Sequence, residues 1–279
     1  MKVTYLGTTM LLLDDGTDQI LFDCHVTRPS LWKCAFGKLK TDLLVCERVF
    51  RDFEMNRVRA VFLSHSHHDH CLDLPYFANR TGALVFGSES SLNVARGGDV
   101  AEDRLQQFVP DTEVSIGRFS VRVMKSLHSK PFIFNNNLGQ TIDRPLTQPA
   151  AMKEFKEGGS FEFLITHSKK TILIRPSYNF IPGALKDIHA DILYLGISGL
   201  AKDHADTRKR FFSETIGRVK PKIVIPIHWD NFFLPLYGPV RGLPKYGDDT
   251  GRSLAILSEY CRRHGVDFLL QLPRSSTEF

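Results

Sequence analysis

The chain has 279 residues, of which 42% are hydrophobic and 24% are charged, a composition that is typical of globular proteins and excludes disordered and fibrous chains. A chain of this length buries roughly three quarters of the surface that it exposes when unfolded, so it needs no disulfide or structural metal merely to fold. The net charge of +5 comes from 36 basic and 31 acidic residues that are dispersed along the sequence, which favours an anionic small molecule over nucleic acid as the partner.

Cysteine usage and hydropathy indicate where the protein is located. The five cysteines are an odd number and show no Cys-X-X-Cys spacing, which argues against a disulfide framework and indicates a reducing compartment. The apolar run at residues 10–13 is interrupted by Asp14-Asp15-Gly16, so it is too short for a signal core or a membrane span. We therefore expect a cytoplasmic protein without a membrane span.

The first part of the chain predicts a β-meander followed by a helical excursion. Strands are expected at residues 2–6, 10–13 and 19–22, with a turn at residues 14–16. Residues 33–57 carry apolar side chains at helical spacing. The nearly continuous apolar run Arg59-Ala60-Val61-Phe62-Leu63 then predicts a buried strand that ends in a loop.

The rest of the chain repeats this order of elements. Further strands are predicted at residues 84–86, 119–123, 161–166, 171–174, 192–195 and 222–227, and helices at residues 88–94, 207–219 and 253–264. Each half contains a buried strand that ends in a histidine, at His65 and at His228. No linker divides the chain, so we expect one domain over residues 1–279.

The interval 130–160 interrupts the pattern because it is rich in Asn, Pro and Gly and has little strand character. A long segment of this kind inside a compact domain is usually functional or disordered. It begins just after His128, and we interpret it as a lid or as an insertion that shapes the substrate site.

Four histidines and an aspartate follow the buried strand, within Ser64-His65-Ser66-His67-His68-Asp69-His70-Cys71. In an extended segment residues two apart point the same way, so His65 and His67 can approach one cation. Asp69 and His70, around the following bend, can face a second cation, and His68 should point away. Imidazole and carboxylate groups are ligands that zinc and similar divalent metals accept.

The pattern His-X-His-X-Asp-His resembles the signature of the metallo-β-lactamase-fold hydrolases, and the order of the other motifs extends the resemblance over most of the chain. The start of the chain and the ending Ile225-Pro226-Ile227-His228 look most like the branch that contains ascorbate-phosphate lactonase and N-acylphosphatidylethanolamine phospholipase D. The resemblance implies an α/β fold, a four-layer αββα sandwich of two mixed β-sheets flanked by helices. It places one or two metals, zinc with manganese or iron as alternatives, at one edge of the sheets.

The same resemblance implies which residues bind the metals. His128 is expected beside His65 and His67, and His228 is expected beside Asp69 and His70.

The chain departs from the family pattern at one position. The family normally has an aspartate between His128 and His228, at the end of a strand, that bridges both metals. Residues 171–179 contain no carboxylate, and Pro176 or Ser177 occupies the expected place. Since a hydroxyl is a poorer bridge than a carboxylate, we expect weaker or unequal metal occupancy and reduced or unusual activity. Asp191 is a less suitable substitute because it begins the next strand.

The implied chemistry is hydrolysis by a metal-bound hydroxide, with Asp69 as the catalytic residue that orients the hydroxide or accepts its proton. Arg175 could hold an anionic group of the substrate or replace lost metal charge. Ser177, Tyr178 and Trp229 are further candidates for substrate contact because they flank ligand positions.

Three functions remain open from the sequence. The first is a metal-dependent hydrolase of a small ester, lactone or phosphodiester, with the net charge favouring the phosphodiester. The second is a nuclease of the same fold, which would require the basic run Arg208-Lys209-Arg210 to border the metal cleft. The third is a non-catalytic module that binds metal or a small ligand, for which the missing aspartate is the main argument.

Overall fold

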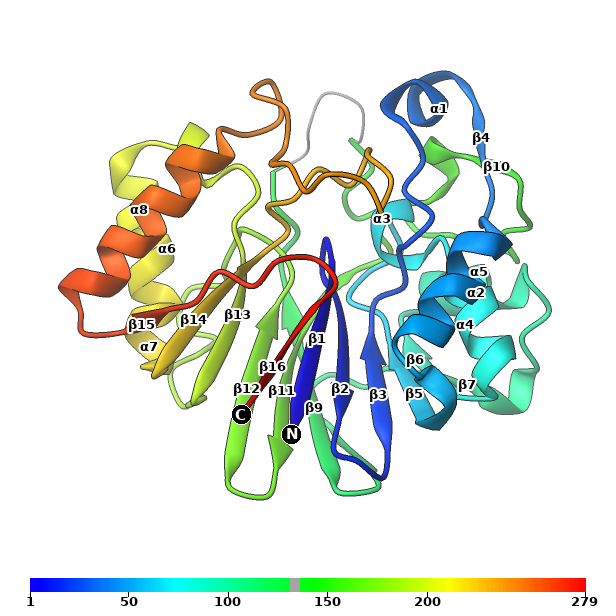
Figure 1. Cartoon of the computed structure of the whole chain (residues 1–279), viewed down its shortest axis with the longest axis horizontal. Helices are drawn as coiled ribbons and strands as arrows, with labels where there is room; N and C mark the ends of the chain where they lie inside the picture. The colour runs from blue at the N-terminus through cyan, green and yellow to red at the C-terminus, as the bar shows by residue number, and fades with distance from the viewer. Residues whose placement is uncertain (131–135) are drawn as a thin grey trace.

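Two seven-stranded β-sheets lie side by side in the computed structural model, which describes residues 1–130 and 136–279 (Figure 1). The first sheet has the order β16-β1-β2-β3-β5-β6-β7, formed by β1 (Lys2–Gly7), β2 (Met10–Asp14), β3 (Gln19–Phe22), β5 (Val58–Phe62), β6 (Leu84–Gly87), β7 (Leu105–Gln107) and β16 (Ser275–Glu278). The second has the order β15-β14-β13-β12-β11-β9-β8, formed by β8 (Glu113–Ile116), β9 (Phe119–Ser126), β11 (Ser160–His167), β12 (Lys170–Arg175), β13 (Ile192–Gly196), β14 (Ile223–Ile227) and β15 (Asp267–Phe268).

Both sheets are mixed. Strands β1, β2 and β3 pair antiparallel, which confirms the predicted meander, whereas β3, β5, β6 and β7 are parallel. In the second sheet β8, β9, β11 and β12 pair antiparallel, and β12, β13, β14 and β15 are parallel. The apolar runs of the sequence become strands that are buried on both faces, because each sheet is covered on one side by helices and on the other by its partner sheet.

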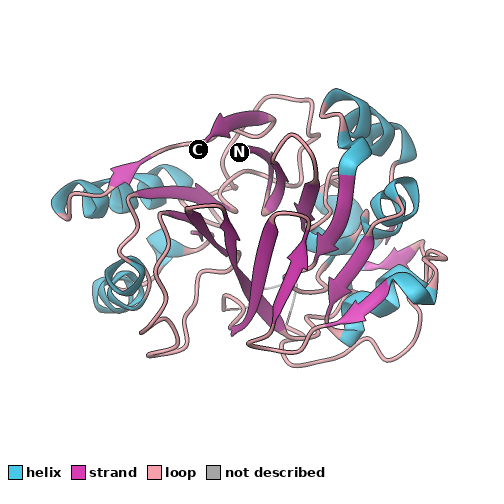
Figure 2. Ribbon diagram, turned by 90° about the horizontal axis from the view of Figure 1, so that it is seen from below, coloured by secondary structure: helices cyan, strands magenta, loops and turns pink. Residues whose placement is uncertain are grey.

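Helices form the two outer layers of the sandwich (Figures 1 and 2). The helices beside the first sheet are α2 (Leu43–Asp52), α4 (Leu74–Thr81) and α5 (Glu89–Arg96), and those beside the second are α6 (Ala205–Glu214), α7 (Ile216–Val219) and α8 (Thr250–Arg263). Two short helices, α1 (Leu31–Phe36) and α3 (His68–Cys71), lie near one edge of the sandwich, and β4 (Lys38–Leu39) pairs with β10 (Ala150–Ala151). None of the helices in the described residues is both long enough and apolar enough to cross a membrane.

An aromatic cluster fills the space between the sheets. Phe62 stacks on Phe22 and Phe86 of the first sheet at ring-centroid distances of 5.3 and 4.8 Å. Phe163 of the second sheet lies 5.1 Å from the Phe22 ring. Aromatic pairs of this geometry add about 0.5–1.5 kcal/mol each beyond the area that they bury. The sheets therefore share one continuous core, and together with the helices they form the expected αββα architecture.

The structure differs from the predicted elements in several places; helix α4 was not predicted, and β4 interrupts the helical excursion predicted over residues 33–57. The helix predicted over residues 207–219 is two helices, because buried Thr215 leaves the helical conformation (φ −109°, ψ −85°) and its hydroxyl donates to the Phe211 carbonyl at 2.7 Å. The short strands β7, β8, β15 and β16 were not predicted. They have two to four residues, and a periodicity of two is not detectable over so few positions.

Much of the interval 130–160 lacks regular structure, as the sequence predicts, although residues 131–135 lie outside the described residues. Its described part contains only β10 and one turn of 3₁₀ helix, Met152–Glu154, before β11 begins at Ser160. The interval lies against the histidine loop: the Ser66 amide donates to the Glu157 carbonyl at 3.0 Å, and Asn137 contacts His67. Its role as a lid or as an insertion that shapes the substrate site stays a prediction.

Candidate metal centre

The carboxyl ends of strands from both sheets meet at one edge of the sandwich, near α3 in Figure 1. The loop that carries His65 and His67 follows β5, and His228 follows β14. His128 follows β9, which runs parallel to β12 because both strands pair antiparallel with β11. Side chains separated by up to 163 positions in the sequence therefore reach one site because the strands that deliver them end at the same edge.

The first donor set consists of His65, His67 and His128, whose ligand atoms lie within 4.8 Å of one another. The His67 Nε2 proton is directed at the Asn137 amide oxygen, 2.8 Å away, which leaves the lone pair on Nδ1. The His128 Nδ1 proton is donated to the Ser129 carbonyl at 2.6 Å, which leaves the lone pair on Nε2. Two nitrogen lone pairs thus face each other across 3.1 Å, from His67 Nδ1 to His128 Nε2.

The same set offers a third donor. His65 Nδ1 lies 3.1 Å from the Ser64 hydroxyl, whereas the buried His65 Nε2 has no hydrogen-bond partner among the described residues. Burial and the neighbouring His128 lower the pKa of His67 to about 3, and burial also lowers the pKa values of His65 and His128. Protons therefore do not relieve the repulsion between the lone pairs at neutral pH, whereas a divalent cation would. The set fits such an ion.

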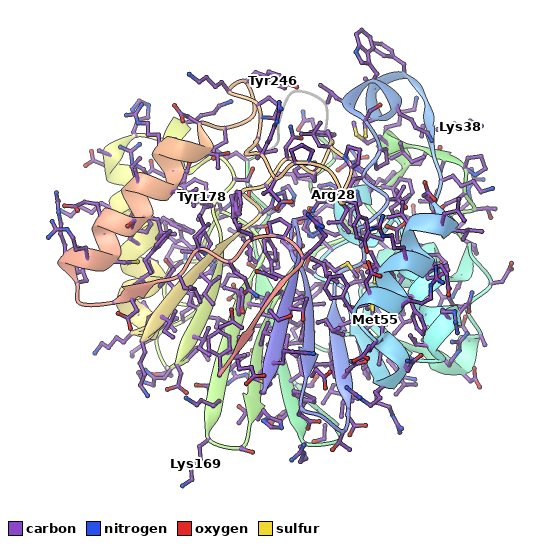
Figure 3. All side chains as sticks on the ribbon, in the orientation of Figure 1. Arg28, Lys38, Met55, Lys169, Tyr178 and Tyr246 are labelled. Atoms are coloured by element: carbon purple, nitrogen blue, oxygen red, sulfur yellow. The ribbon has the colours of Figure 1, made fainter. Side chains whose placement is uncertain are left out.

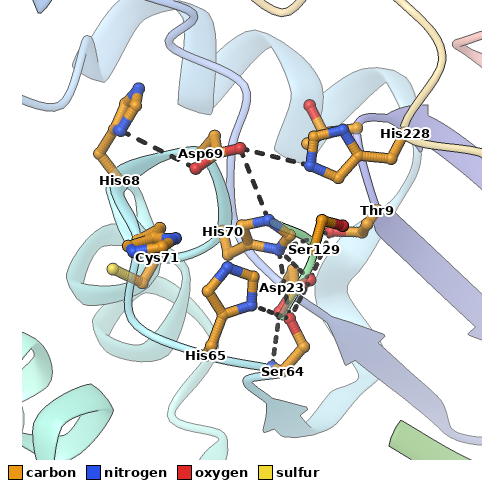
Figure 4. A network of polar contacts seen from close by, with 12 residues as sticks. Thr9, Asp23, Ser64, His65, His68, Asp69, His70, Cys71, Ser129 and His228 are labelled. Atoms are coloured by element: carbon orange, nitrogen blue, oxygen red, sulfur yellow. Dashed lines mark hydrogen bonds and ion pairs between the residues drawn. The ribbon is translucent and has the colours of Figure 1, made fainter. Parts of the chain in front are cut away.

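The second donor set consists of Asp69, His70 and His228 (Figure 4). The Asp69 Oδ2 atom lies 3.5 Å from His70 Nε2 and 3.4 Å from His228 Nε2. Burial alone would raise the pKa of Asp69, but the neighbouring His70 and His228 hold it well below the usual value, so the group is a carboxylate at neutral pH. Burial alone would lower the pKa of His70, but Asp69 and Asp23 raise it, which shows that this pocket favours a positive charge.

The two sets adjoin each other but share no donor among the described residues. The His65 and His70 rings, one from each set, have centroids 3.7 Å apart.

Asp23, which follows β3, orients the second set and was not identified from the sequence. Its Oδ2 atom accepts from His70 Nδ1 at 2.8 Å and from the Thr9 hydroxyl at 2.5 Å, and its Oδ1 atom accepts from the Ser64 amide at 2.7 Å. Because the His70 Nδ1 proton is directed at Asp23, the Nε2 lone pair faces Asp69. Only its place directly after a buried strand, at the same edge as His65, could have indicated this role.

A second buried carboxylate, Asp230, positions the backbone at His228. It accepts from the Arg28 guanidinium at 2.7 Å, from the Tyr5 hydroxyl at 2.7 Å and from the Thr8 amide at 2.8 Å. The His228 amide in turn donates to the Thr8 carbonyl at 2.6 Å. These contacts hold His228 at φ +58°, a left-handed conformation that a non-glycine residue adopts at a cost of about 1 kcal/mol or more.

A cavity of about 350 Å³ opens beside both sets. His67, Asp69, His128 and His228 contribute to its wall, together with Ser177 and Tyr178, two of the four predicted substrate contacts. Much of the remaining wall is apolar, including Phe180, Phe211, Phe232, Leu243 and Met152.

The other two predicted substrate contacts are not brought to this wall. Arg175 is buried, its Nε atom lies 3.0 Å from Glu162 Oε2, and its Nη2 atom donates to the Asn179 carbonyl. A buried guanidinium requires a counter-charge, and β11 supplies it, so Arg175 does not face the cavity. Trp229 is also buried, as part of the core between the sheets and α8.

His68 belongs to neither donor set, as expected, but it does line the cavity. Its Nδ1 atom lies 3.8 Å from Asp69 Oδ1 (Figure 4). Its Nε2 atom lies 3.7 Å from Cys34 Sγ. The first turn of α3 rotates the ring away from His65 and toward α1.

Comparison with known proteins agrees with this fold. The profile of the metallo-beta-lactamase superfamily matches residues 6–176, more than half of the chain. A UPF0173 metal-dependent hydrolase of Roseiflexus sp. strain RS-1 is 25% identical over 270 residues, which cover 95% of this chain and 91% of that protein.

Solved structures show the same fold at lower identity. Igni18, a metallo hydrolase from Ignicoccus hospitalis, superimposes with a TM-score of 0.61 at 15% identity, covering 100% of this chain and 98% of that one. Zn²⁺-bound PqqB from Methylobacterium extorquens superimposes with a TM-score of 0.59 at 11% identity, covering 100% of both chains. The chain belongs to the metallo-beta-lactamase superfamily.

Proposed function

We propose that this chain, a metal-dependent hydrolase of the metallo-beta-lactamase superfamily, cleaves a small anionic ester, lactone or phosphodiester at the candidate metal centre. The observation that carries the proposal is the convergence of two three-donor sets at the wall of one cavity. A phosphodiester is the favoured substrate, because the chain has a net charge of +5 and because Lys202 contributes to that wall, whereas Lys130, also at the wall, pairs with Asp203.

Zinc is the proposed metal, with manganese or iron as alternatives, because five imidazoles and one carboxylate form the two sets. His65, His67 and His128 would hold one ion, and Asp69, His70 and His228 a second. A bound divalent cation supplies positive charge that lowers the pKa of water and stabilises the charge that develops on the substrate oxygens. The zinc-bound relative PqqB supports this choice of metal.

Asp69 is the residue that would accept the proton of the attacking water. Its Oδ2 atom lies near His70 and His228, which leaves Oδ1 as the accepting atom, and Asp69 contributes to the cavity wall. A carboxylate with a lowered pKa stays ionised at neutral pH and is ready for this role. The hydroxyl of Ser177 and the ring of Tyr178 would contact the substrate from the opposite sheet.

The absence of the expected bridging carboxylate is the point at which the proposed centre departs from the family pattern. Strand β12 ends at Arg175, and the residues that follow are Pro176 and Ser177. With Ser177 in place of an acid, the two ions would repel each other with less compensation, so we propose unequal occupancy, with one site filled at lower metal concentration.

The nuclease alternative has less support. Thr207 and Phe211 of α6 line the cavity, whereas Arg208 and Lys209 line a separate groove between α6 and α8. Two of the three residues of the basic run thus face away from the cavity, and the third, Arg210, lies over the ring of Phe180. The non-catalytic binding module stays an alternative because residues 171–179 contain no carboxylate.

Metal analysis followed by turnover of bis(p-nitrophenyl) phosphate tests the proposal. We expect bound metal and turnover in the parent chain. His67→Ala should lose turnover and bind less metal, since one of the two donor sets has lost a ligand. His264→Ala, a control at the exposed histidine that ends α8, should keep both. Bound metal without turnover on a panel of esters, lactones and phosphodiesters would support the binding module. Degradation of RNA or DNA in preference to the small substrates would support the nuclease.

A further inference from the structure

Exposed aromatic and basic side chains lie on two segments that also contribute residues to the cavity wall, α1 and the loop between β14 and α8. We call this the mouth surface: Trp32, Lys33 and Phe36 of α1, Lys38 of β4, and Lys245 and Tyr246 of the loop between β14 and α8. Trp32 is 76% exposed, Phe36 is 79% exposed and Tyr246 is 53% exposed. Figure 3 labels Tyr246 on its loop, at the same end of the molecule as α1.

Helix α1 presents a different set of side chains to each side. Leu31, Cys34 and Ala35 contribute to the cavity wall. Trp32 and Phe36 are turned to solvent, where their rings stack on each other at 5.2 Å. A single exposed apolar residue is ordinary, but a stacked and uncovered Trp–Phe pair beside a cavity indicates a surface that another body covers.

The charges on this surface indicate which kind of binding partner covers it. Lys33, Lys38 and Lys245 are exposed, and none of them forms an ion pair with a described residue. Figure 3 shows Lys38 at the outer side of the segment that follows α1. The aromatic rings are thus accompanied by uncompensated positive charge, which an anionic surface would complement.

We infer that the mouth surface docks on an anionic lipid layer. Tryptophan and tyrosine are enriched where apolar and aqueous phases meet, and lysines next to them attract anionic headgroups. Since no helix of the described residues could cross a membrane, the docking is peripheral. The apolar wall of the cavity, with Phe180, Phe211 and Phe232, adjoins this surface through Tyr246 and would accept the apolar part of an amphiphile.

A second copy of the chain is a poorer occupant. A two-fold contact brings the same patch of both copies together, so Lys33 and Lys38 would approach their own symmetry equivalents. Repulsion between like charges at an interface opposes such a contact. The inference concerns binding alone, so its test does not depend on the hydrolysis proposed above.

Vesicle binding by the full chain tests the inference. Vesicles of pure phosphatidylcholine are compared with vesicles of equal parts phosphatidylcholine and phosphatidylglycerol by co-sedimentation. The chain has two tryptophans, Trp32 at the mouth and Trp229 in the core. Brominated anionic lipids should therefore quench the fluorescence of Trp32 and leave the 4% exposed Trp229 unquenched.

Two variants and one matched control make the test specific. We expect Trp32→Ala and Lys33→Glu each to lower the vesicle partition coefficient roughly tenfold. Lys169→Glu makes the same charge change in the turn between β11 and β12, at the opposite end of the molecule in Figure 3, and should leave binding within about twofold. All three positions are exposed, so the variants should keep the thermal stability of the parent chain.

Three results would overturn the inference. The first is equal binding to neutral and anionic vesicles, or none to either. The second is an equal loss in Lys169→Glu and Lys33→Glu, which would indicate attraction by net charge rather than by the mouth surface. The third is a dimer in solution that Trp32→Ala dissociates, without vesicle binding, which would make this face a contact between copies.

Discussion

Asp23 determines the direction of the His70 lone pair although it belongs to neither donor set. It accepts hydrogen bonds from His70, Thr9 and Ser64, and so connects the turn after β1, the end of β3 and the histidine loop. An imidazole that is held at Nδ1 presents Nε2 in a fixed direction and with greater basicity. Asp23 is therefore a positioning residue for the second set.

We expect Asp23→Asn to weaken metal binding at the second set by roughly 10–100-fold while the first set keeps most of its affinity. The physical reason is that a neutral amide accepts the His70 proton less strongly than a carboxylate does. Zinc titration against a competing chelator should show one weakened site in the variant, with circular dichroism to confirm the fold. Asp267→Asn, at an exposed position, is the control. Equal weakening of both sites would contradict this role.

At the scale of elements, a turn of the first sheet is tied to two elements of the second. Asp15, between β2 and β3, contacts Arg118 Nε at 2.9 Å in the turn before β9, and His167 Nε2 at 3.1 Å at the end of β11. It also accepts the amides of Thr17 and Asp18. Burial alone would raise the pKa of Asp15, but the Asp18 and Thr17 amides, together with Arg118 and His167, hold it well below the usual value.

We expect Asp15→Asn to lower the free energy of unfolding by about 1–2 kcal/mol at neutral pH. Because the folded-state pKa is lowered, this stabilisation is present above the unfolded-state value of about 4 and is lost as the pH falls from there toward the folded-state pKa. The difference between parent and variant should thus be constant from neutral pH down to about pH 5 and shrink below about pH 4.

Urea denaturation at a series of pH values measures this difference, with Asp187→Asn as a control at an exposed aspartate. A difference that stays the same down to the lowest pH at which the chain folds would show that the charge of Asp15 does not stabilise the contact between the sheets.

For the whole molecule, the candidate metal centre joins the two sheets. His65, His67, Asp69 and His70 follow a strand of the first sheet, whereas His128 and His228 follow strands of the second. Each donor set therefore takes ligands from both sheets, and an ion that binds either set holds the sheets together at this edge. A ligand that binds only the folded state stabilises that state.

Removal of metal should accordingly lower the melting temperature by roughly 5–10 °C, the shift expected when metal is present at about a hundred times its dissociation constant. Differential scanning calorimetry of the chelated and the zinc-restored protein measures the shift. The His67→Ala variant should respond less, since one set has lost a donor. An unchanged melting temperature after verified loss of metal would show that metal binding at this centre does not stabilise the fold.

Local patterns in the sequence were sufficient for much of the fold. The meander at the start of the chain, the buried strand before His65 and the helices α5 and α8 follow from alternation, apolar runs and helical spacing, which nearby residues determine. The clustering of His65, His67, Asp69 and His70 in six residues is also local, and it indicated metal chemistry without any knowledge of the fold. His128 and His228, by contrast, were identified through a family resemblance, since each is a lone histidine after a strand.

Only the tertiary structure decided which distant groups meet. Asp23 turned out to orient His70, Asn137 to orient His67, and Glu162 to draw Arg175 away from the cavity. Likewise, the sequence alone does not show that the rings of Trp32 and Phe36 on α1 are exposed to solvent rather than packed in the core. Chain order determines which backbone conformation a segment prefers, but the partner of each side chain depends on which strands pair and at which edge they end.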